Sequence, residues 1–386
     1  MLWFAGLLGL FFAASLADAL LNSDTGDDGA EAEGEAGGTA SLAEDPRGSL
    51  ADLLDELPGW PEDQQPPDAA EPSPWDHLLH DPWAAPDTPD EPLPPDGPDS
   101  TDDPPPPPAA GDFLRAADDA GAVLTGGDGA DTLFGGAGDD LIHGGAGNDL
   151  MVAGLGDNRL WGGDGDDRLI GGPGADTLDG GPGNDTLLAG GGAALLRGGA
   201  GDDLLLGGDG DTTLEGGAGN DTLLAGGGNN MLAGGFGDDL LIAGPGADTL
   251  FGGAGNDTLV GVRFDADGND RAGPSLLNGG AGDDLLILGR DDTAHGGSGA
   301  DSFLLGDWMA GGGAVIADFD PAEDRLLVGY DPGLYPAPVV SLAAVADDPG
   351  AAVVLLDGQA LAVVRGGAGL DPQAITLVPG WPPQFG

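Results

Sequence analysis

The chain has no cysteine and no lysine, and it has only ten arginines among 386 residues. Without cysteine there are no disulfide bonds and no thiolate metal ligands, and without lysine there is no Schiff-base chemistry. Acidic residues number 68, so the formal net charge is −58. Nucleic acids and anionic membrane surfaces are polyanions, and a field of this sign excludes both as partners. Multivalent cations are the natural counter-charge.

The motifs of common enzyme classes are also missing. The sequence contains no HExxH, no GxSxG and no Walker phosphate-binding loop. Metalloproteases, serine hydrolases and many nucleoside triphosphatases depend on these arrangements. We therefore predict a protein that is not an enzyme.

An apolar stretch opens the chain. Residues 2–17 are uncharged and apolar, Asp18 interrupts the run, and residues 19–21 restore it. This length lies between the core of a signal peptide, about 7–15 residues, and a transmembrane helix of about 20 residues. We predict that residues 1–21 are a membrane anchor or a cleaved signal peptide, with a helix buried in the folded protein as the third alternative. Both main alternatives place the rest of the chain outside the cytoplasm.

Residues 22–122 have a different composition. Asp, Glu, Pro, Ala and Gly dominate, and five consecutive prolines occupy positions 104–108. Such a segment buries too little apolar surface to offset the conformational entropy that folding removes. We predict a disordered, acidic, proline-rich linker over these residues.

From residue 126 the sequence is periodic. Residues 126–260 divide into fifteen consecutive units of nine, in which the first, second and fourth places are usually Gly, the sixth is usually Asp and the eighth is always apolar. The extended residues around the eighth place make a short strand, and the glycine-rich part makes a turn. Each unit reverses the chain once, so unit n stacks on unit n+2 at about 4.8 Å.

The units resemble the hemolysin-type, or RTX, calcium-binding repeat GGxGxDxUx, where U is a large apolar residue. Examples in this chain are GGDGADTLF at 126–134 and GGAGNDTLV at 252–260. The resemblance implies a right-handed parallel β-roll with several Ca²⁺ ions between stacked turns, held by the sixth-place Asp residues and turn carbonyls. It also implies export by type I secretion machinery to the cell surface or the extracellular space.

Donor chemistry favours the same ion. The repeats offer carboxylate and carbonyl oxygens without soft donors, and flexible glycine turns suit Ca²⁺ better than the strictly octahedral Mg²⁺. Stacked carboxylates about 4.8 Å apart repel each other by roughly 1 kcal/mol per pair in water and by more where water is excluded. We therefore expect calcium binding and folding to be one event.

The two edges of the expected roll differ. Alternate units fall on opposite edges, so the sixth-place residues form two columns, here called the complete edge and the depleted edge. The complete edge carries Asp at every sixth place: Asp131, Asp149, Asp167, Asp185, Asp203, Asp221, Asp239 and Asp257. The depleted edge reads Asp140, Asn158, Asp176, Ala194, Thr212, Asn230 and Asp248. We predict calcium ligands at every Asp of both columns, with the complete edge binding first because affinity follows ligand charge.

A 36-residue period continues the complete edge beyond the regular units. Units that open with Ala-Gly recur at this spacing, and the period identifies residues 261–278 as containing a nine-residue insertion. It assigns Asp284 and then Asp301 to the complete edge, although counting onward in units of nine residues alone would place Asp284 on the depleted edge. Within the insertion, Asp265, Asp267, Asn269 and Asp270 resemble part of an Asp-rich calcium loop, with a solvated bulge as the alternative.

The repeats stop after residue 304, and residues 305–386 are predicted to cap the roll. Asp357-Gly358 between two apolar runs indicates a β-hairpin, and a last strand is expected at 375–378. A solenoid end exposes an unpaired edge, so a cap is physically required. The predicted fold is all-β: a β-roll over 126–304, a hairpin or β-sandwich-like cap, and a disordered region before them.

We predict a non-catalytic, calcium-binding β-roll protein of the cell surface or extracellular space, with no nucleic-acid partner and possible anchoring through residues 2–21. Two alternatives stay open. The roll could be an accessory or targeting module of a secreted hydrolase or polysaccharide-modifying enzyme, or the protein could be a surface adhesin.

Overall fold

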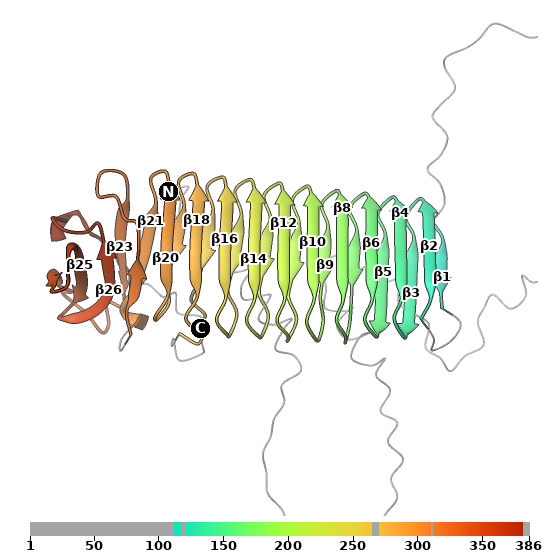
Figure 1. Ribbon diagram of the computed structural model, residues 1–386, viewed down its shortest axis with the longest axis horizontal. Coiled ribbons are helices and arrows are strands. Elements are labelled where there is room, and N and C mark those ends of the chain that lie inside the picture. Colours follow the sequence, from blue (N-terminus) through green and yellow to red (C-terminus); the bar gives the residue numbers. More distant parts are fainter. Residues whose placement is uncertain (1–110, 117–120, 265–269, 310–311, 381–386) are drawn as a thin grey trace, which may run out of the picture. The chain divides into compact units, whose positions relative to one another are not determined.

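A computed structural model describes residues 111–116, 121–264, 270–309 and 312–380. The described residues form two facing β-sheets whose strands alternate along the chain, so that each coil of backbone contributes one strand to each sheet (Figure 1). This is the predicted parallel β-roll with antiparallel strands at its C-terminal end, and the prediction of the roll and its cap is confirmed. Residues 22–110 of the predicted disordered region lie outside the described residues. The predictions for residues 1–21 lie outside the described residues, as do those for Asp265, Asp267 and Asn269.

Sheet A has 13 strands and sheet B has 14. In spatial order, sheet A consists of β1 (Phe113–Arg115), β3 (Thr132–Ala137), β5 (Leu150–Leu155), β7 (Arg168–Ile170), β9 (Thr186–Leu188), β11 (Leu204–Leu206), β13 (Thr222–Leu224), β15 (Leu240–Ile242), β17 (Thr258–Val260), β19 (Leu285–Ile287), β21 (Ser302–Gly306), β23 (Arg325–Tyr330) and β27 (Thr376–Pro379). Sheet B consists of β2 (Val123–Asp128), β4 (Leu141–Ala146), β6 (Arg159–Asp164), β8 (Thr177–Pro182), β10 (Leu195–Ala200), β12 (Thr213–Ala218), β14 (Met231–Phe236), β16 (Thr249–Ala254), β18 (Leu276–Ala281), β20 (Thr293–Ser298), β22 (Ala314–Ile316), β26 (Gln359–Arg365), β25 (Asp348–Leu356) and β24 (Val340–Val345).

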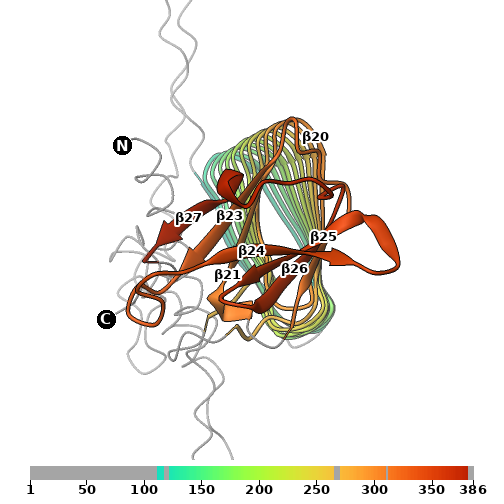
Figure 2. The same cartoon turned by 90° about the vertical axis from the view of Figure 1, so that its left-hand side faces the viewer.

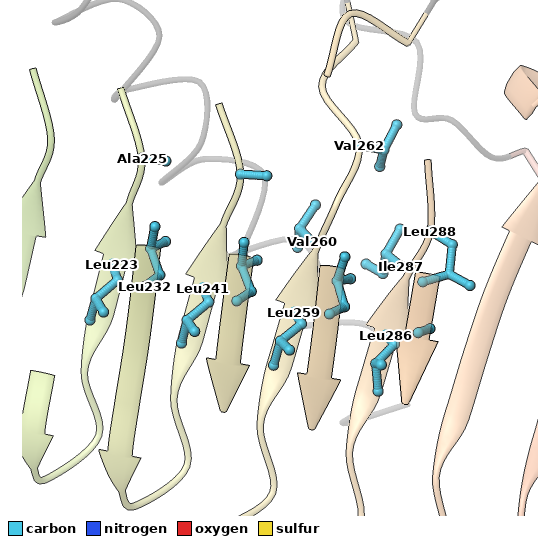
Figure 3. Packing of buried hydrophobic residues seen from close by; sticks show 14 of the residues in the cluster. Leu223, Ala225, Leu232, Leu241, Leu259, Val260, Val262, Leu286, Ile287 and Leu288 are labelled. Carbon is cyan, nitrogen blue, oxygen red and sulfur yellow. The ribbon is translucent and has the colours of Figure 1, made fainter. Parts of the chain in front are cut away.

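The eighth-place side chains fill the interior between the sheets. Parallel pairing aligns each with the residue 18 positions later, as Leu205 aligns with Leu223, and all of them are fully buried. Figure 3 shows Leu223, Leu241, Leu259 and Leu286 at equivalent positions on successive strands of sheet A. Burial of one such leucine stabilises the fold by about 1.5–3 kcal/mol. The apolar eighth place therefore determines which way every unit faces.

The strands of the two sheets differ in length. Sheet B strands within the repeats run six residues and include the first three residues of the following complete-edge turn, so that Gly199 aligns with Gly217. From β7 to β19, sheet A strands run three residues and stop before the depleted-edge turn. In the complete-edge turns the glycines at the second and fourth places have positive φ, for example 122° at Gly199 and 131° at Gly201. These turns are stacked in the register of the sheet ladder.

The insertion does not break the stack. The pairing of β16 with β18 spans 27 residues, Thr249 with Leu276, and it restores the register of both sheets. The insertion falls between β17 and β18, at the depleted edge, where Oδ1 of Asp270 accepts the backbone N–H of Arg263 at 3.2 Å and of Ala272 at 3.0 Å. The 36-residue interpretation of this region is confirmed.

One part of the linker prediction is wrong. Strand β1, Phe113–Arg115, lies inside the segment 22–122 and pairs with β3. The short sequence Asp112-Phe113-Leu114-Arg115 reproduces the sixth to ninth places of a unit without the glycine frame before it. An existing ladder therefore orders these residues, because the next strand supplies their hydrogen-bonding partners.

The C-terminal cap extends both sheets. Strand β27 continues sheet A beside β23, while β26, β25 and β24 continue sheet B as an antiparallel meander. The predicted hairpin joins β25 to β26, and both Asp357 and Gly358 have positive φ, as its two-residue turn requires. Two 3₁₀ turns, η1 (Asp307–Met309) and η2 (Pro372–Ala374), complete this end. The end-on view in Figure 2 shows the meander crossing the end of the roll.

Candidate metal-binding edges

A continuous hydrogen-bond ladder runs along the complete edge. The backbone N–H of each sixth-place Asp donates to Oδ1 of the sixth-place Asp in the next turn on the same edge, as Asp185 does to Asp203 at 2.7 Å and Asp203 to Asp221 at 2.8 Å. The ladder crosses the insertion, because the N–H of Asp257 donates to Asp284 at 2.8 Å. Asp284 thus lies on the complete edge, as the 36-residue period predicted.

The second carboxylate oxygen of these residues has no partner. Eleven sixth-place Asp residues are buried and leave Oδ2 without a hydrogen bond: Asp131, Asp149, Asp167, Asp185, Asp203, Asp221, Asp239, Asp257 and Asp284 on the complete edge, and Asp140 and Asp176 on the depleted edge. A buried charged oxygen without a partner costs several kcal/mol. The complete edge is therefore a row of unsatisfied negative charge.

The first-place glycines leave room for these oxygens. A Cβ added to Gly198 would collide with Oδ2 of Asp203 and with the carbonyl oxygen of Gly216 in the next turn, and an equivalent pair of oxygens surrounds each first-place glycine of this edge from Gly126 to Gly279. Each gap between turns is thus lined by a carboxylate oxygen and a backbone carbonyl oxygen. Glycine at the first place keeps this small oxygen-lined space open.

Burial and crowding change the acidity of the column. Burial raises the pKa of Asp167, Asp203 and Asp239 to about 7, and the carboxylates in the turns above and below add to the increase. The pKa of Asp284 is raised to about 7 for the same reasons. These carboxylates lack a positive charge nearby, which a bound cation would supply.

Where the depleted edge has lost its carboxylates, neutral side chains satisfy its polar groups. Where a carboxylate is replaced by Asn230, the amide Nδ2 donates to the carbonyls of Gly226, Gly227 and Gly228 at 3.1–3.5 Å and to Oδ1 of Asp248 at 3.0 Å. The hydroxyl of Thr212 in turn donates to Oδ1 of Asn230 at 2.7 Å. Neutral donors here take the place that a cation would have between turns.

First-place alanine marks the turns that need no cation. Ala153, Ala189 and Ala225 open the units whose sixth places are Asn158, Ala194 and Asn230. Ala243 precedes Asp248, whose Oδ2 accepts the backbone N–H of Gly244 at 2.9 Å and so has a partner. Every unpartnered Oδ2, by contrast, belongs to a unit that begins with glycine.

The structure adds three sixth-place acids that the sequence reasoning missed. Asp112 and Asp324 begin and end the complete edge, since the N–H of Asp112 donates to Asp131 and the N–H of Asp301 donates to Asp324 at 3.0 Å. Asp292 continues the depleted edge, is fully buried and accepts the N–H of Gly289 at 2.7 Å. Each is followed by three residues that correspond to the seventh, eighth and ninth places of a unit, as Asp324-Arg325-Leu326-Leu327 corresponds to Asp167-Arg168-Leu169-Ile170. This correspondence could have identified the three residues from the sequence.

A second ladder lies outside the first one. Fifth-place Asp and Asn side chains accept the N–H of the fifth residue in the next turn, as Asp202 does from Asn220 at 2.8 Å. On the complete edge Asn and Asp alternate through eight turns: Asn148, Asp166, Asn184, Asp202, Asn220, Asp238, Asn256 and Asp283. Because the types alternate, no two fifth-place carboxylates are direct neighbours along this part of the edge.

The donor set fits a hard divalent cation. It consists of carboxylate and backbone carbonyl oxygens, which Ca²⁺ prefers. Among the described residues no three His, Asp or Glu side chains converge on one point. A cation on the complete edge would therefore rely on carboxylates from the stacked turns together with turn carbonyls. The predicted ligands of the complete edge lie together in one column, whereas those of the depleted edge are separated by neutral residues.

Comparison with known families matches the RTX calcium-binding nonapeptide repeat (4 copies) to residues 125–160, 161–196, 188–223, 206–241, 224–259, 267–292 and 288–313. The matched segments contain all of the predicted ligands. No curated protein matches the chain.

Proposed function

Because the chain carries hemolysin-type RTX calcium-binding nonapeptide repeats over residues 125–313, we propose that it is a non-catalytic protein whose roll folds when Ca²⁺ ions enter the complete edge. The ions would be held by Asp131, Asp149, Asp167, Asp185, Asp203, Asp221, Asp239, Asp257, Asp284 and Asp301, with turn carbonyls completing the coordination. Asp140, Asp176 and Asp248 on the depleted edge would contribute weaker ligands.

The observation that carries this proposal is the row of buried, unpartnered Oδ2 atoms. Without a cation, each gap on the complete edge brings two carboxylates close together in a buried place. A divalent cation supplies the missing partner and reverses the sign of the interaction. Folding and binding are therefore coupled, and the free energy of ion binding stabilises the roll.

The proposed location is the cell surface or the extracellular space. RTX repeats are typical of secreted proteins, and extracellular calcium modules bind with Kd values of about 0.1–1 mM. Export by type I machinery is part of this proposal. Within the described residues, no helix has the length and apolar character needed to cross a membrane.

Calcium titration of the full chain, followed by circular dichroism, tests the proposal. We expect little β structure in EDTA and a cooperative gain in β signal as Ca²⁺ rises to about millimolar levels. Magnesium at the same concentration is the matched control and should produce a much smaller gain. Full β signal in EDTA, or equal responses to the two ions, would contradict the proposal.

A further inference from the structure

Sheet A carries an apolar stripe that the calcium edges do not use. The stripe consists of its ninth-place side chains, which are apolar in ten successive turns: Phe134, Val152, Ile170, Leu188, Leu206, Leu224, Ile242, Val260, Ile287 and Leu304. The ninth places of sheet B are mixed and include Asp179, Arg197 and Glu215. Because the ninth places of sheet A are apolar in turn after turn and those of sheet B are not, the outer faces of the two sheets differ in composition although both are built from the same repeat.

The stripe points away from the interior. Successive residues of a strand face opposite sides, and the eighth-place residue beside each ninth-place residue faces inward. Val152, Ile170, Leu206 and Leu224 do not pack into the cluster that forms the interior. From Ile242 onward, by contrast, the stripe joins that cluster, which includes Val262 and Trp308. The part from Phe134 to Leu224 needs another cover.

No described element supplies that cover. All 27 described strands belong to the two sheets, and the two described helical turns lie at the C-terminal end. Six apolar side chains in adjacent turns make a continuous apolar strip. Strips of this kind on soluble proteins mark contact sites.

We propose that residues 2–17 of the same chain dock on the stripe between Phe134 and Leu224. Six turns at about 4.8 Å span about 24 Å, and 16 residues in a helix also span about 24 Å. The segment is apolar and carries no charge. Roughly 90 residues separate it from strand β1, and a flexible chain of that length has an r.m.s. reach of about 50 Å or more.

Charge favours this occupant over a second copy of the chain. Each copy has a formal net charge of −58, and a charge far from zero opposes association of two such chains. An uncharged segment meets no such opposition. Its tether also gives an effective concentration of about millimolar, which a separate partner lacks.

Cysteine cross-linking in the full chain tests the proposal, because the natural sequence has no cysteine to interfere. The test variant combines Leu10→Cys with Leu188→Cys, in the stripe on β9. The control combines Leu10→Cys with Asp179→Cys, at the ninth place of the neighbouring strand β8 in sheet B. Both are treated with a short bismaleimide in calcium, after circular dichroism has shown that the roll has formed. This check separates the result from that of the calcium proposal.

We expect the intramolecular cross-link of the test variant, to β9, to form at least about tenfold faster than that of the control, to β8, since docking raises the local concentration of the segment. Adding Leu206→Glu to the test variant should reduce this excess. Equal rates, mainly intermolecular cross-links that indicate a second copy, or a mature chain without residues 2–17 would each overturn the proposal. Loss of the cross-link when phosphatidylcholine vesicles take up the protein would identify a membrane as the occupant and would also overturn it.

Discussion

The two edges of the roll are built from the same repeat, yet they solve the same problem in different ways. At Asp203 on the complete edge, a buried carboxylate oxygen has no partner and lies beside a turn carbonyl. At Asn230 on the depleted edge, an amide group donates to three turn carbonyls and leaves nothing for a cation to satisfy. The comparison shows that a repeat can keep its place in the stack while losing its need for an ion.

On our account the complete edge depends on ions, whereas the depleted edge keeps only isolated unpartnered carboxylates, at Asp140 and Asp176. The stacked turns of the complete edge are joined by carboxylates that repel each other, so this side forms only with calcium on our account. The depleted edge contains no two consecutive carboxylates from Asp140 to Asp292. Its neutral residues lower the number of charges that calcium must neutralise before the roll can close.

The largest expected difference between the edges comes from Asp203→Ala and Asp176→Ala. Both carboxylates are buried, accept one backbone N–H and leave Oδ2 unpartnered. They differ in their neighbours, because Asp203 lies between two Asp residues and Asp176 between Asn158 and Ala194. Asp203→Ala should damage two adjacent sites and raise the calcium midpoint about tenfold or more, whereas Asp176→Ala should change it by less than about threefold. Matched calcium titrations by circular dichroism decide this, and equal effects would mean that neighbouring charge is irrelevant.

A conversion of one edge into the other is the second way to test the comparison. Asp203→Asn places an amide donor beside the carbonyl of Gly216 and removes a charge, as at Asn230. We expect the calcium-free roll to become more stable by about 1–3 kcal/mol and the number of bound ions to fall. The β signal that remains in EDTA, followed by circular dichroism, and calcium counting by isothermal calorimetry measure the two effects. Lower stability in EDTA would show that the amide does not replace the ion.

Acid should partly substitute for calcium on the complete edge. In the calcium-free fold, the pKa of Asp167, Asp203 and Asp239 is raised from 3.8 to about 7, chiefly by burial. Between these values the folded chain binds protons that the unfolded chain does not bind. Stability is therefore greatest below about pH 4, decreases as the pH rises through this window, and levels off above pH 7. Circular dichroism in EDTA at pH 4.5 and 7.5 should show more β structure at pH 4.5, and more β structure at pH 7.5 would contradict this expectation.

A smaller effect is expected from the first place of the units. Gly198→Ala introduces a Cβ that collides with Oδ2 of Asp203 and the carbonyl of Gly216, so it should destabilise the calcium-loaded roll by about 1–3 kcal/mol. The reciprocal control is Ala189→Gly on the depleted edge, which creates room where no carboxylate needs it. Its cost should stay within about 1 kcal/mol. Chemical unfolding in saturating calcium compares the two, and a larger loss for Ala189→Gly would refute the role of the first-place glycine.

Much of this architecture was readable from the sequence because the repeat encodes its own register. The apolar eighth place determines the inward face, and the 36-residue period identified Asp284 correctly where simple counting failed. Asp112, Asp292 and Asp324 were missed because they stand in units without the glycine frame. They can be recognised from the residues that follow them, as in Asp324-Arg325-Leu326-Leu327, but only if the usual glycines before the Asp are not required.

Other features depend on atoms that a pattern does not describe. Oδ2 of Asp248 accepts the N–H of Gly244, in a unit that opens with Ala243 in place of glycine, so an Asp at the usual sixth place behaves unlike Asp203. The apolar ninth places of sheet A become visible in the sequence only when alternate units are separated. The structure shows in addition that Val152, Ile170, Leu206 and Leu224 lie outside the interior cluster.

The most direct test of the central claim is anomalous diffraction from crystals of the calcium-loaded protein. We expect strong calcium peaks in successive gaps along the complete edge, between Asp131 and Asp301, and much weaker peaks along the depleted edge. Peaks of similar height along both edges would contradict the claim, as would a complete edge without bound calcium.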